Sequence, residues 1–211
     1  MEEVETILAD LKEREGAQIA NYFAAAFFGD FRPSEQVALR WDDFDFKQRN
    51  VRVARAVVRG KTKASTKTCL VRDVELSERA WSAFEAQRAI TQLVGRQVFW
   101  NPAAKAPWAD IQSQWKIWAR CLRCLGFRYR EQYQTRHTFA TLALMEGANP
   151  TWVARQLGHA NAQMLFKVYG KWIDGADKNR ERDKLSKVFA ASTTASADSV
   201  REPSRGKSAE S

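Results

Sequence analysis

Residues 133–169 read YQTRHTFATLALMEGANPTWVARQLGHANAQMLFKVY, and the rest of the chain is organised around them. This stretch holds both histidines of the chain, Arg136, and a tyrosine ten residues after His159. Arginine offers phosphate oxygens a permanently charged fork, and histidine donates a hydrogen bond or moves a proton near neutral pH. Tyrosine is a nucleophile only where its phenolate is created or stabilised, because its free pKa is about 10. These residue types suit chemistry on a phosphodiester.

The stretch resembles the second half of the catalytic domain of the tyrosine recombinases, the phage integrase family. That family carries a His-x-x-Arg box, a Leu-Gly-His box and a tyrosine nine or ten residues later. Here the matching positions are Tyr133-x-x-Arg136, LGH at residues 157–159, and Tyr169. One box alone would fit a helix with a core histidine and a surface tyrosine, but three boxes at family spacing favour the resemblance.

A second stretch is similar to the first arginine box of the same family, Thr-Gly-x-Arg-x-x-Glu followed by Leu-x-Trp-x-Asp. The residues in matching positions are Arg32, Glu35, Leu39, Trp41 and Asp43. Proline suits the first turn of a helix, so the proline that follows Arg32 places this arginine at a helix N-terminus, where backbone N–H groups favour an anion.

Two positions depart from the family pattern. Asp30 stands where the family usually has glycine, and aspartate tolerates left-handed backbone better than most residues, so we expect the turn to survive with a charge near the phosphate site. Tyr133 stands where the family most often has histidine. Its hydroxyl donates a hydrogen bond but is a poor proton acceptor at neutral pH. The resemblance therefore implies activity at a reduced rate.

Length and charge point to one globular domain that meets a polyanion. The chain has 211 residues, 45% of them hydrophobic, and a net charge of +9. Residues 1–16 are acidic, so the remainder holds 32 bases against 19 acids, and such an asymmetry is typical of proteins that bind nucleic acid. A basic surface also serves solubility or acidic lipid.

The cysteines are Cys69, Cys121 and Cys124. An odd, low count without a signal peptide fits a reducing cytoplasm. The CxxC spacing at 121–124 falls inside an expected helix without a second ligand pair, and no carboxylates cluster at metal-ligand spacing, so we expect no metal and no cofactor. The sequence has no run of eighteen apolar residues, which predicts no membrane-spanning segment.

Hydrophobic periodicity predicts an α+β fold, mostly helical, with a small antiparallel sheet or hairpin on one edge. Strands are expected within residues 42–76, with a polar loop from Arg59 to Thr68. Ile90, Ile111, Trp115 and Trp118 are expected in the core. Helices are predicted at 2–14, 17–28, a short segment after Pro33, 77–93 with Ser77 as N-cap, 109–125, 134–146, 150–157, and from about 161 to Tyr169.

Nine bases and no acids lie between residues 47 and 72. Folding alone does not require such a bias, whereas a strand pair lying along a phosphate backbone does. The predicted DNA contacts are Arg59, Lys61, Lys63 and Arg72. The family carries a catalytic lysine in this hairpin, and the resemblance assigns it to Lys67, with Lys61 and Lys63 as rivals.

The resemblance implies a site-specific recombinase, an integrase of a phage or mobile element, acting on double-stranded DNA. Arg32 and Arg136 would clamp the non-bridging oxygens, Lys67 would protonate the leaving 5′-oxygen, and His159 would hydrogen-bond the phosphoryl group. Tyr169 would form the 3′-phosphotyrosyl linkage, with Tyr133 completing the site. Two alternatives stay open: a type IB topoisomerase-like nicking-closing enzyme, and a catalytically weakened relative that only binds DNA.

Residues 1–189 are predicted to form the catalytic domain and residues 190–211 a disordered tail. Relatives usually have a preceding core-binding domain, so we expect this chain to be an excised domain or a fragment. We expect a homo-oligomer, a tetramer, on DNA and a monomer in isolation. Leu185, Val188 and Phe189 form a small apolar stripe that docks either on a second protomer or on its own domain.

Overall fold

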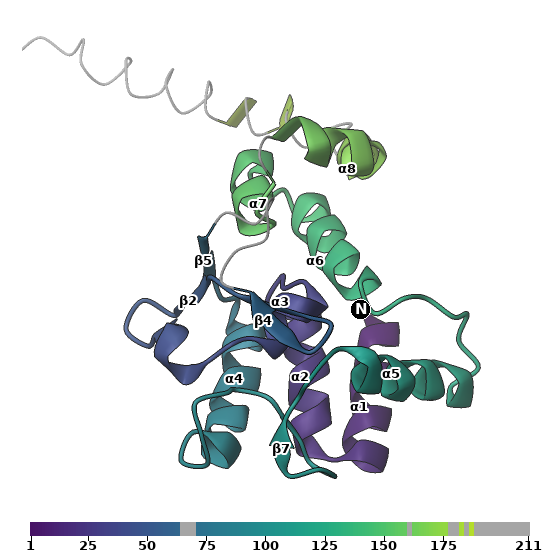
Figure 1. The fold of residues 1–211 in the computed structure, drawn as a ribbon. Helices are drawn as coiled ribbons and strands as arrows, with labels where there is room; N and C mark the ends of the chain where they lie inside the picture. Colours follow the sequence, from purple (N-terminus) through teal and green to yellow (C-terminus); the bar gives the residue numbers. More distant parts are fainter. Residues whose placement is uncertain (64–70, 160–161, 177–181, 184–185, 188–211) are drawn as a thin grey trace, which may run out of the picture.

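The computed structural model describes residues 1–63, 71–159, 162–176, 182–183 and 186–187, and it has the predicted mostly helical α+β fold (Figure 1). The helices are α1 (Glu2–Glu15), α2 (Ala17–Phe28), α3 (Pro33–Val37), α4 (Glu78–Thr91), α5 (Gln112–Cys124), α6 (Gln134–Met145), α7 (Pro150–Gln156) and α8 (Ala162–Ala176), with a 3-10 turn at Trp41–Asp43. The strands are β1 (Phe44–Asp45), β2 (Asn50–Val53), β3 (Ala56–Val58), β4 (Lys61–Lys63), β5 (Arg72–Glu75), β6 (Trp100–Asn101) and β7 (Ala106–Pro107).

The larger hydrophobic core is built around α2. This helix is apolar on almost every side, and a helix of that kind is stable only when other elements cover it. Its Tyr22 and Phe23 are fully buried and pack edge to face, with ring centroids 5.1 Å apart. Phe23 also stacks on Trp118 of α5 at 5.3 Å. Helices α1 and α4 flank α2, so three predicted helices form one packed layer (Figure 1).

Helix α2 ends at a turn that only a small residue can make. A Cβ on Gly29 would lie 2.4 Å from Cε2 of Phe31 and 2.8 Å from the carbonyl oxygen of Ala25. Asp30 follows with a φ of 61°, so the expectation that an aspartate accepts left-handed backbone at this turn is confirmed. The turn redirects the chain from α2 into α3.

A three-stranded antiparallel sheet of order β1-β2-β5 covers one edge of this core. Val51 pairs with Val74, and both side chains are buried. The predicted antiparallel pairing across the basic segment is therefore confirmed. Ser77, directly after the sheet, accepts a hydrogen bond from the backbone of Ala80 at 3.2 Å, and the predicted N-cap of α4 is correct.

The expectation of a polar loop from residue 59 onward is wrong over its first part. Lys61–Lys63 forms strand β4, which pairs with β3 in a second antiparallel hairpin. Arg59 and Gly60, with φ values of 51° and 71°, make the tight turn between the two strands. Two successive positive φ values suit a two-residue hairpin turn, a signal that the charge bias of the segment hides.

Three predicted core positions and one helix boundary need correction. Ile90, Ile111 and Trp115 are 37%, 39% and 46% exposed. The buried face of α5 runs through Gln114, Trp118 and Leu122, which are four residues apart, and Trp115 lies beside that face. Helix α5 begins at Gln112 rather than at 109, and the segment between α4 and α5, for which no strand was predicted, contains the short β6–β7 pair.

A second, smaller core forms between α6, α7 and α8. Its buried residues include Leu144, Val153, Leu157 and Leu165, and also Tyr169. The expectation that the last helix ends at the tyrosine is wrong, since α8 continues to Ala176 and holds Tyr169 within it. A tyrosine inside a packed helix has a defined position relative to α6 and α7, which a tyrosine at a frayed end would lack.

Lys67, Cys69, the apolar stripe at 185–189 and the predicted tail at 190–211 lie outside the described residues. Within the described part of the chain, no helix combines the length and the apolar character needed to cross a membrane.

Gly29→Ala should destabilise the domain by roughly 1–3 kcal/mol, because the added methyl overlaps Phe31 and a backbone carbonyl. The matched control is Gly170→Ala in α8, where nothing lies within 4 Å of the added Cβ and alanine is the better helix former. Urea unfolding of both variants measures the difference. A Gly29→Ala protein as stable as Gly170→Ala would contradict the steric account of this turn.

Candidate active site

Arg32 is the N-cap residue of α3, with extended backbone and Pro33 directly after it, as the sequence predicts. The carboxylate of Glu35 reaches back to it. Oε2 accepts from the Arg32 backbone N–H at 3.1 Å, and Oε1 accepts from Arg32 Nη1 at 2.7 Å. The helix start therefore fixes both the backbone and the guanidinium of Arg32.

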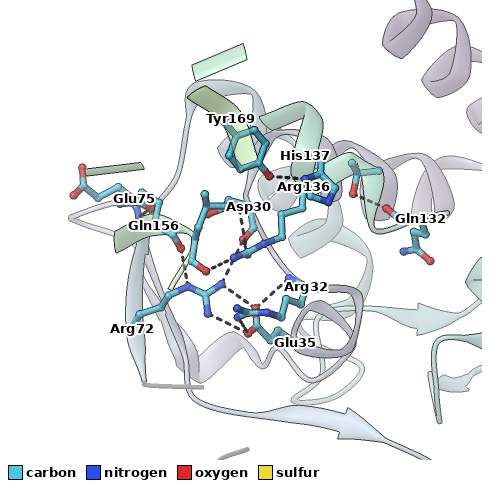
Figure 2. A network of polar contacts seen from close by, with 12 residues as sticks. Asp30, Arg32, Glu35, Arg72, Glu75, Gln132, Arg136, His137, Gln156 and Tyr169 are labelled. Atoms are coloured by element: carbon cyan, nitrogen blue, oxygen red, sulfur yellow. Dashed lines mark hydrogen bonds and ion pairs between the residues drawn. The ribbon is translucent and has the colours of Figure 1, made fainter. Parts of the chain in front are cut away.

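Glu35 is buried and is the shared anion of the site (Figure 2). Arg72 of β5 grips the same carboxylate with both of its terminal nitrogens, Nη1 to Oε1 at 3.1 Å and Nη2 to Oε2 at 2.8 Å. Burial alone would raise the pKa of Glu35, but its hydrogen bond with Arg72 and the charges of Arg72 and Arg32 lower that pKa to about 2. Glu35 therefore stays ionised and holds two arginines in fixed positions.

Arg72 also joins the two cores. Its Nε donates to the carbonyl oxygen of Gln156 at 2.7 Å, and the Gln156 side chain accepts from the Glu75 backbone N–H at 3.0 Å. The Arg72 side chain is only 7% exposed. The sequence analysis grouped Arg72 with the surface contacts to DNA, whereas its guanidinium lies among the buried groups of the site.

Arg136 of α6 is 1% exposed and is the largest fully buried side chain among the described residues. Its Nη1 donates to the carbonyl oxygen of Asp30 at 2.7 Å, and its Nη2 donates to the carbonyl oxygen of Leu157. Burial lowers the pKa of Arg136, although the charge of Asp30 opposes this. Two backbone carbonyls from segments far apart in the sequence thus hold one guanidinium, whose remaining N–H groups are donors for an anion.

The side chain of Asp30 is buried next to the same guanidinium. Oδ1 lies 3.2 Å from Arg136 Nη1, yet neither carboxylate oxygen accepts a hydrogen bond from the described residues. Burial raises the pKa of Asp30 to about 7, against the opposing charges of Arg136 and Arg72. The acidic group expected at this place is therefore present, and its burial favours the protonated, neutral form.

The Leu-Gly-His box forms the C-terminal turn of α7. Gly158 has a φ of 59°, and a Cβ on it would lie 2.9 Å from Cδ of Arg72, so glycine lets the arginine approach the turn. The backbone N–H of His159 closes the turn on the carbonyl oxygen of Ala154 at 2.9 Å. His159 Nδ1 is buried without a hydrogen-bond partner among the described residues. Burial, then the charges of Arg136, Arg32 and Arg72, lower the pKa of His159 to about 4, so the ring is neutral at pH 7.

Tyr169 packs against α6, and its hydroxyl oxygen lies 2.5 Å from His137 Nδ1. Burial raises the pKa of Tyr169 to about 12. Tyr133 lies one helical turn before His137, and the two rings meet edge to face at 5.2 Å. The sequence analysis did not select His137, although its position four residues after Tyr133 places both on one helix face, which was the available signal.

The remaining predicted residues lie on the surface. Arg59, Lys61 and Lys63 are exposed on the β3–β4 hairpin. Tyr133 is 37% exposed and lines an open groove of about 420 Å³ together with Arg32 and Trp115. Among the described residues, no group of three or more His, Cys, Asp or Glu side chains is arranged to hold a metal ion.

The fold and the site together define a catalytic domain of the recombinase type. Its structure resembles that of the Tn1549 transposon integrase in complex with circular intermediate DNA (TM-score 0.71, 16% identity, 87% of this chain and 64% of that one). It also resembles the XerA recombinase (TM-score 0.66, 17% identity, 80% and 58%).

The sequence matches the model of the phage integrase family over residues 1–172, and this chain belongs to that family. It is 32% identical to the prophage integrase IntR of Escherichia coli K12 over 195 residues, which are 82% of this chain and 47% of IntR. The chain thus spans about half the length of this relative.

Asp30→Asn should remove a pH dependence from the stability of the domain. In the folded protein the pKa of Asp30 is about 7, against 3.8 for the free group. Between these values the unfolded chain releases a proton that the folded chain keeps, so the Asp30 contribution to the free energy of unfolding falls as pH rises from about 4 to about 7. Relative to Asp30→Asn, the native protein should lose up to about 4 kcal/mol over this range.

Urea unfolding at a series of pH values measures this difference. Asp73→Asn, which alters an exposed carboxylate on β5, is the matched control and should follow the native protein. Parallel curves for the native protein and Asp30→Asn would contradict a raised pKa at Asp30.

Proposed function

We propose that this chain is the catalytic domain of a site-specific DNA recombinase, an integrase, that cuts and rejoins DNA through a 3′-phosphotyrosyl intermediate. The observation that carries the proposal is a cluster of arginines close to a histidine and a tyrosine. The charges of these arginines lower the pKa of His159, and the charge of Arg136 also acts to lower the pKa of Tyr169. Fixed cations next to a nucleophile suit the transfer of a phosphoryl group, because they stabilise the charge on its oxygens in the transition state.

In this mechanism Arg136 and Arg32 bind the non-bridging oxygens of the scissile phosphate. Two of the five N–H groups of Arg136 go to backbone carbonyls, and a phosphate would compete with Asp30, whose Oδ1 lies 3.2 Å from Nη1, for the others. His159, whose Nδ1 has no partner among the described residues, hydrogen-bonds a phosphoryl oxygen in the tautomer that carries a proton there. Arg72 holds Glu35, and through it the position of Arg32.

Tyr169 attacks phosphorus, the bond to the 5′-oxygen breaks, and Lys67 protonates that oxygen. The phosphotyrosyl linkage conserves the energy of the original bond, so a second 5′-hydroxyl can reverse the attack without ATP. Double-stranded DNA is the proposed substrate. The chain would be a monomer in isolation and would assemble into a tetramer on the DNA. We place this reaction in the cytoplasm. Relaxation of supercoiled circles without strand exchange would instead support a type IB topoisomerase-like enzyme.

Tyr169→Phe should abolish covalent attachment to DNA, because only the attacking oxygen is lost while the ring keeps its place in the smaller core. Nicked suicide duplexes with randomised sequence around the nick serve as substrate, and protein–DNA adducts are counted on a denaturing gel. Tyr129→Phe, at an exposed ring, is the matched control and should leave adduct formation unchanged. An adduct retained in Tyr169→Phe would show that another nucleophile is used.

Lys61→Ala and Lys63→Ala should weaken binding to all duplexes by a similar factor, because both side chains are exposed on the β3–β4 hairpin and would contact the DNA backbone. Each lost phosphate contact should reduce the slope of log K against log salt by about one unit. Fluorescence anisotropy over a series of salt concentrations measures the slope. Lys12→Ala, on the acidic helix α1, is the matched control, and an equal slope in all three variants would remove the hairpin from the interface.

A further inference from the structure

The packing of α6 against α8 brings His137 and Tyr169 into contact. His137 lies in α6 and Tyr169 in α8, and the two helices pack through the smaller core. The imidazole Nδ1 lies 2.5 Å from the phenol oxygen, and the ring centroids are 5.7 Å apart (Figure 2). Both side chains line a pocket of about 410 Å³, so the pair sits at the wall of a cavity.

Tyr169 must lose its hydroxyl proton to act as a nucleophile, and His137 is in contact with that hydroxyl. Burial raises the pKa of the phenol to about 12, so at neutral pH Tyr169 is a protonated and weak nucleophile. Burial, and then the charge of Arg136, lower the pKa of His137, so its ring is neutral. A neutral imidazole carries one nitrogen that accepts a proton, and Nδ1 is that nitrogen when Nε2 bears the hydrogen.

His137 makes the direct contact with the hydroxyl oxygen, whereas Asp30, whose pKa burial raises to about 7, acts on Tyr169 through its charge. The two other groups nearby are weaker proton acceptors. His159 has a pKa lowered to about 4, which makes it a poor base. Tyr133 is itself a phenol, and its ring packs against the edge of His137 rather than replacing it. Tyr133 therefore orients the imidazole, while His137 makes the direct contact with the reacting oxygen.

We propose that His137 is the proton acceptor for Tyr169 during DNA cleavage, an assignment that rests on the proposed function. As the phenol oxygen bonds to phosphorus, its proton passes to His137 Nδ1. The electron pair of the breaking bond goes to the 5′-oxygen, which takes a proton from Lys67. In rejoining, the incoming 5′-hydroxyl gives its proton to the neutral amine of Lys67 as its oxygen bonds to phosphorus and displaces the tyrosine, and the other proton returns from His137 to the phenol oxygen. The imidazole thus ends each cycle as it began.

Protonation of His137 before attack would remove the acceptor, so adduct formation should fall at low pH. The groups that face His137 are Tyr133 and Arg136 of α6, Tyr169 of α8, and His159 beyond α7. Of these, Arg136 stays charged, and Tyr169, whose pKa burial raises to about 12, stays neutral in the acid range. The acid limb of the profile therefore reports on the two histidines and on Asp30, whose pKa burial raises to about 7 and whose charge acts on Tyr169. The same profile measured in Asp30→Asn separates the Asp30 contribution.

The test compares His137→Asn with the native chain in single-turnover cleavage of the nicked duplexes. The asparagine oxygen replaces Nδ1 as a hydrogen-bond acceptor but cannot take up a proton. We expect adduct formation to slow by about 100-fold or more, with unchanged DNA affinity and melting temperature, and the acid limb assigned to His137 to disappear. His137→Gln, whose oxygen lies further from the backbone, provides a second variant should the first fold poorly.

A substrate with sulfur at the bridging 5′-position separates the two proton transfers, since a thiolate leaves without an acid. It should restore cleavage by Lys67→Ala but not by His137→Asn. Native rates and an unchanged pH profile in both His137 variants would overturn the proposal, as would rescue of His137→Asn by the sulfur substrate.

A readout independent of cleavage keeps the proposal apart from the proposed function. The chain has two histidines, so nitrogen-15 spectra of their rings are simple to assign. We expect an unprotonated Nδ1 on His137, with a resonance that moves in Tyr169→Phe. A protonated Nδ1, or an unmoved resonance, overturns the pairing. Native protein that forms no adduct while this resonance responds would refute the recombinase function instead.

Discussion

The burial of Arg136 is the constraint on which the rest of this structure depends. A guanidinium that is 1% exposed is tolerable only if its N–H groups find acceptors, and here the carbonyl oxygens of Asp30 and Leu157 supply them. Those carbonyls come from the turn after α2 and from the end of α7. Because backbone carbonyls solvate this charge, Arg136 fixes α6, the turn after α2 and the end of α7 relative to one another. The remaining N–H groups of its guanidinium are held at the point where these three segments meet.

The site lies where the two hydrophobic cores meet, and a second polar link holds that junction. Glu35 stays ionised between Arg32 and Arg72, and Arg72 continues to the backbone of α7 through Gln156. Each core thus contributes cationic groups, and neither could form the site alone. Asp30 opposes this arrangement. Burial raises the pKa of its carboxyl group, and in the ionised form this group pairs with the guanidinium of Arg136 and so competes with any other anion.

Basic residues in this chain do two different things, depending on where the fold places them. Arg72 and Arg136 are buried and hydrogen-bonded, so their charges are held at fixed positions in the site. Lys61 and Lys63 are exposed on a two-stranded hairpin, where salt screens their charges and their side chains are free to change conformation. Exposed lysines such as Lys61 and Lys63 suit binding to a long polyanion, whereas buried arginines suit chemistry at a single phosphodiester. A net charge of +9 describes neither, because it sums over both.

The sequence by itself determined the helices, the antiparallel β2–β5 pairing and the identity of the boxes, because apolar periodicity, caps and turn residues act over a few neighbouring positions. It also indicated that Asp30 could make a turn suited to glycine. Only the tertiary structure decided that Trp115 is exposed, that Arg72 is buried, and that His137 meets Tyr169. Periodicity shows which residues share a face, but the element that covers the face is chosen by packing between distant segments. The partner of Tyr169 lies 32 residues away on another helix, and nothing local in either segment specifies that contact.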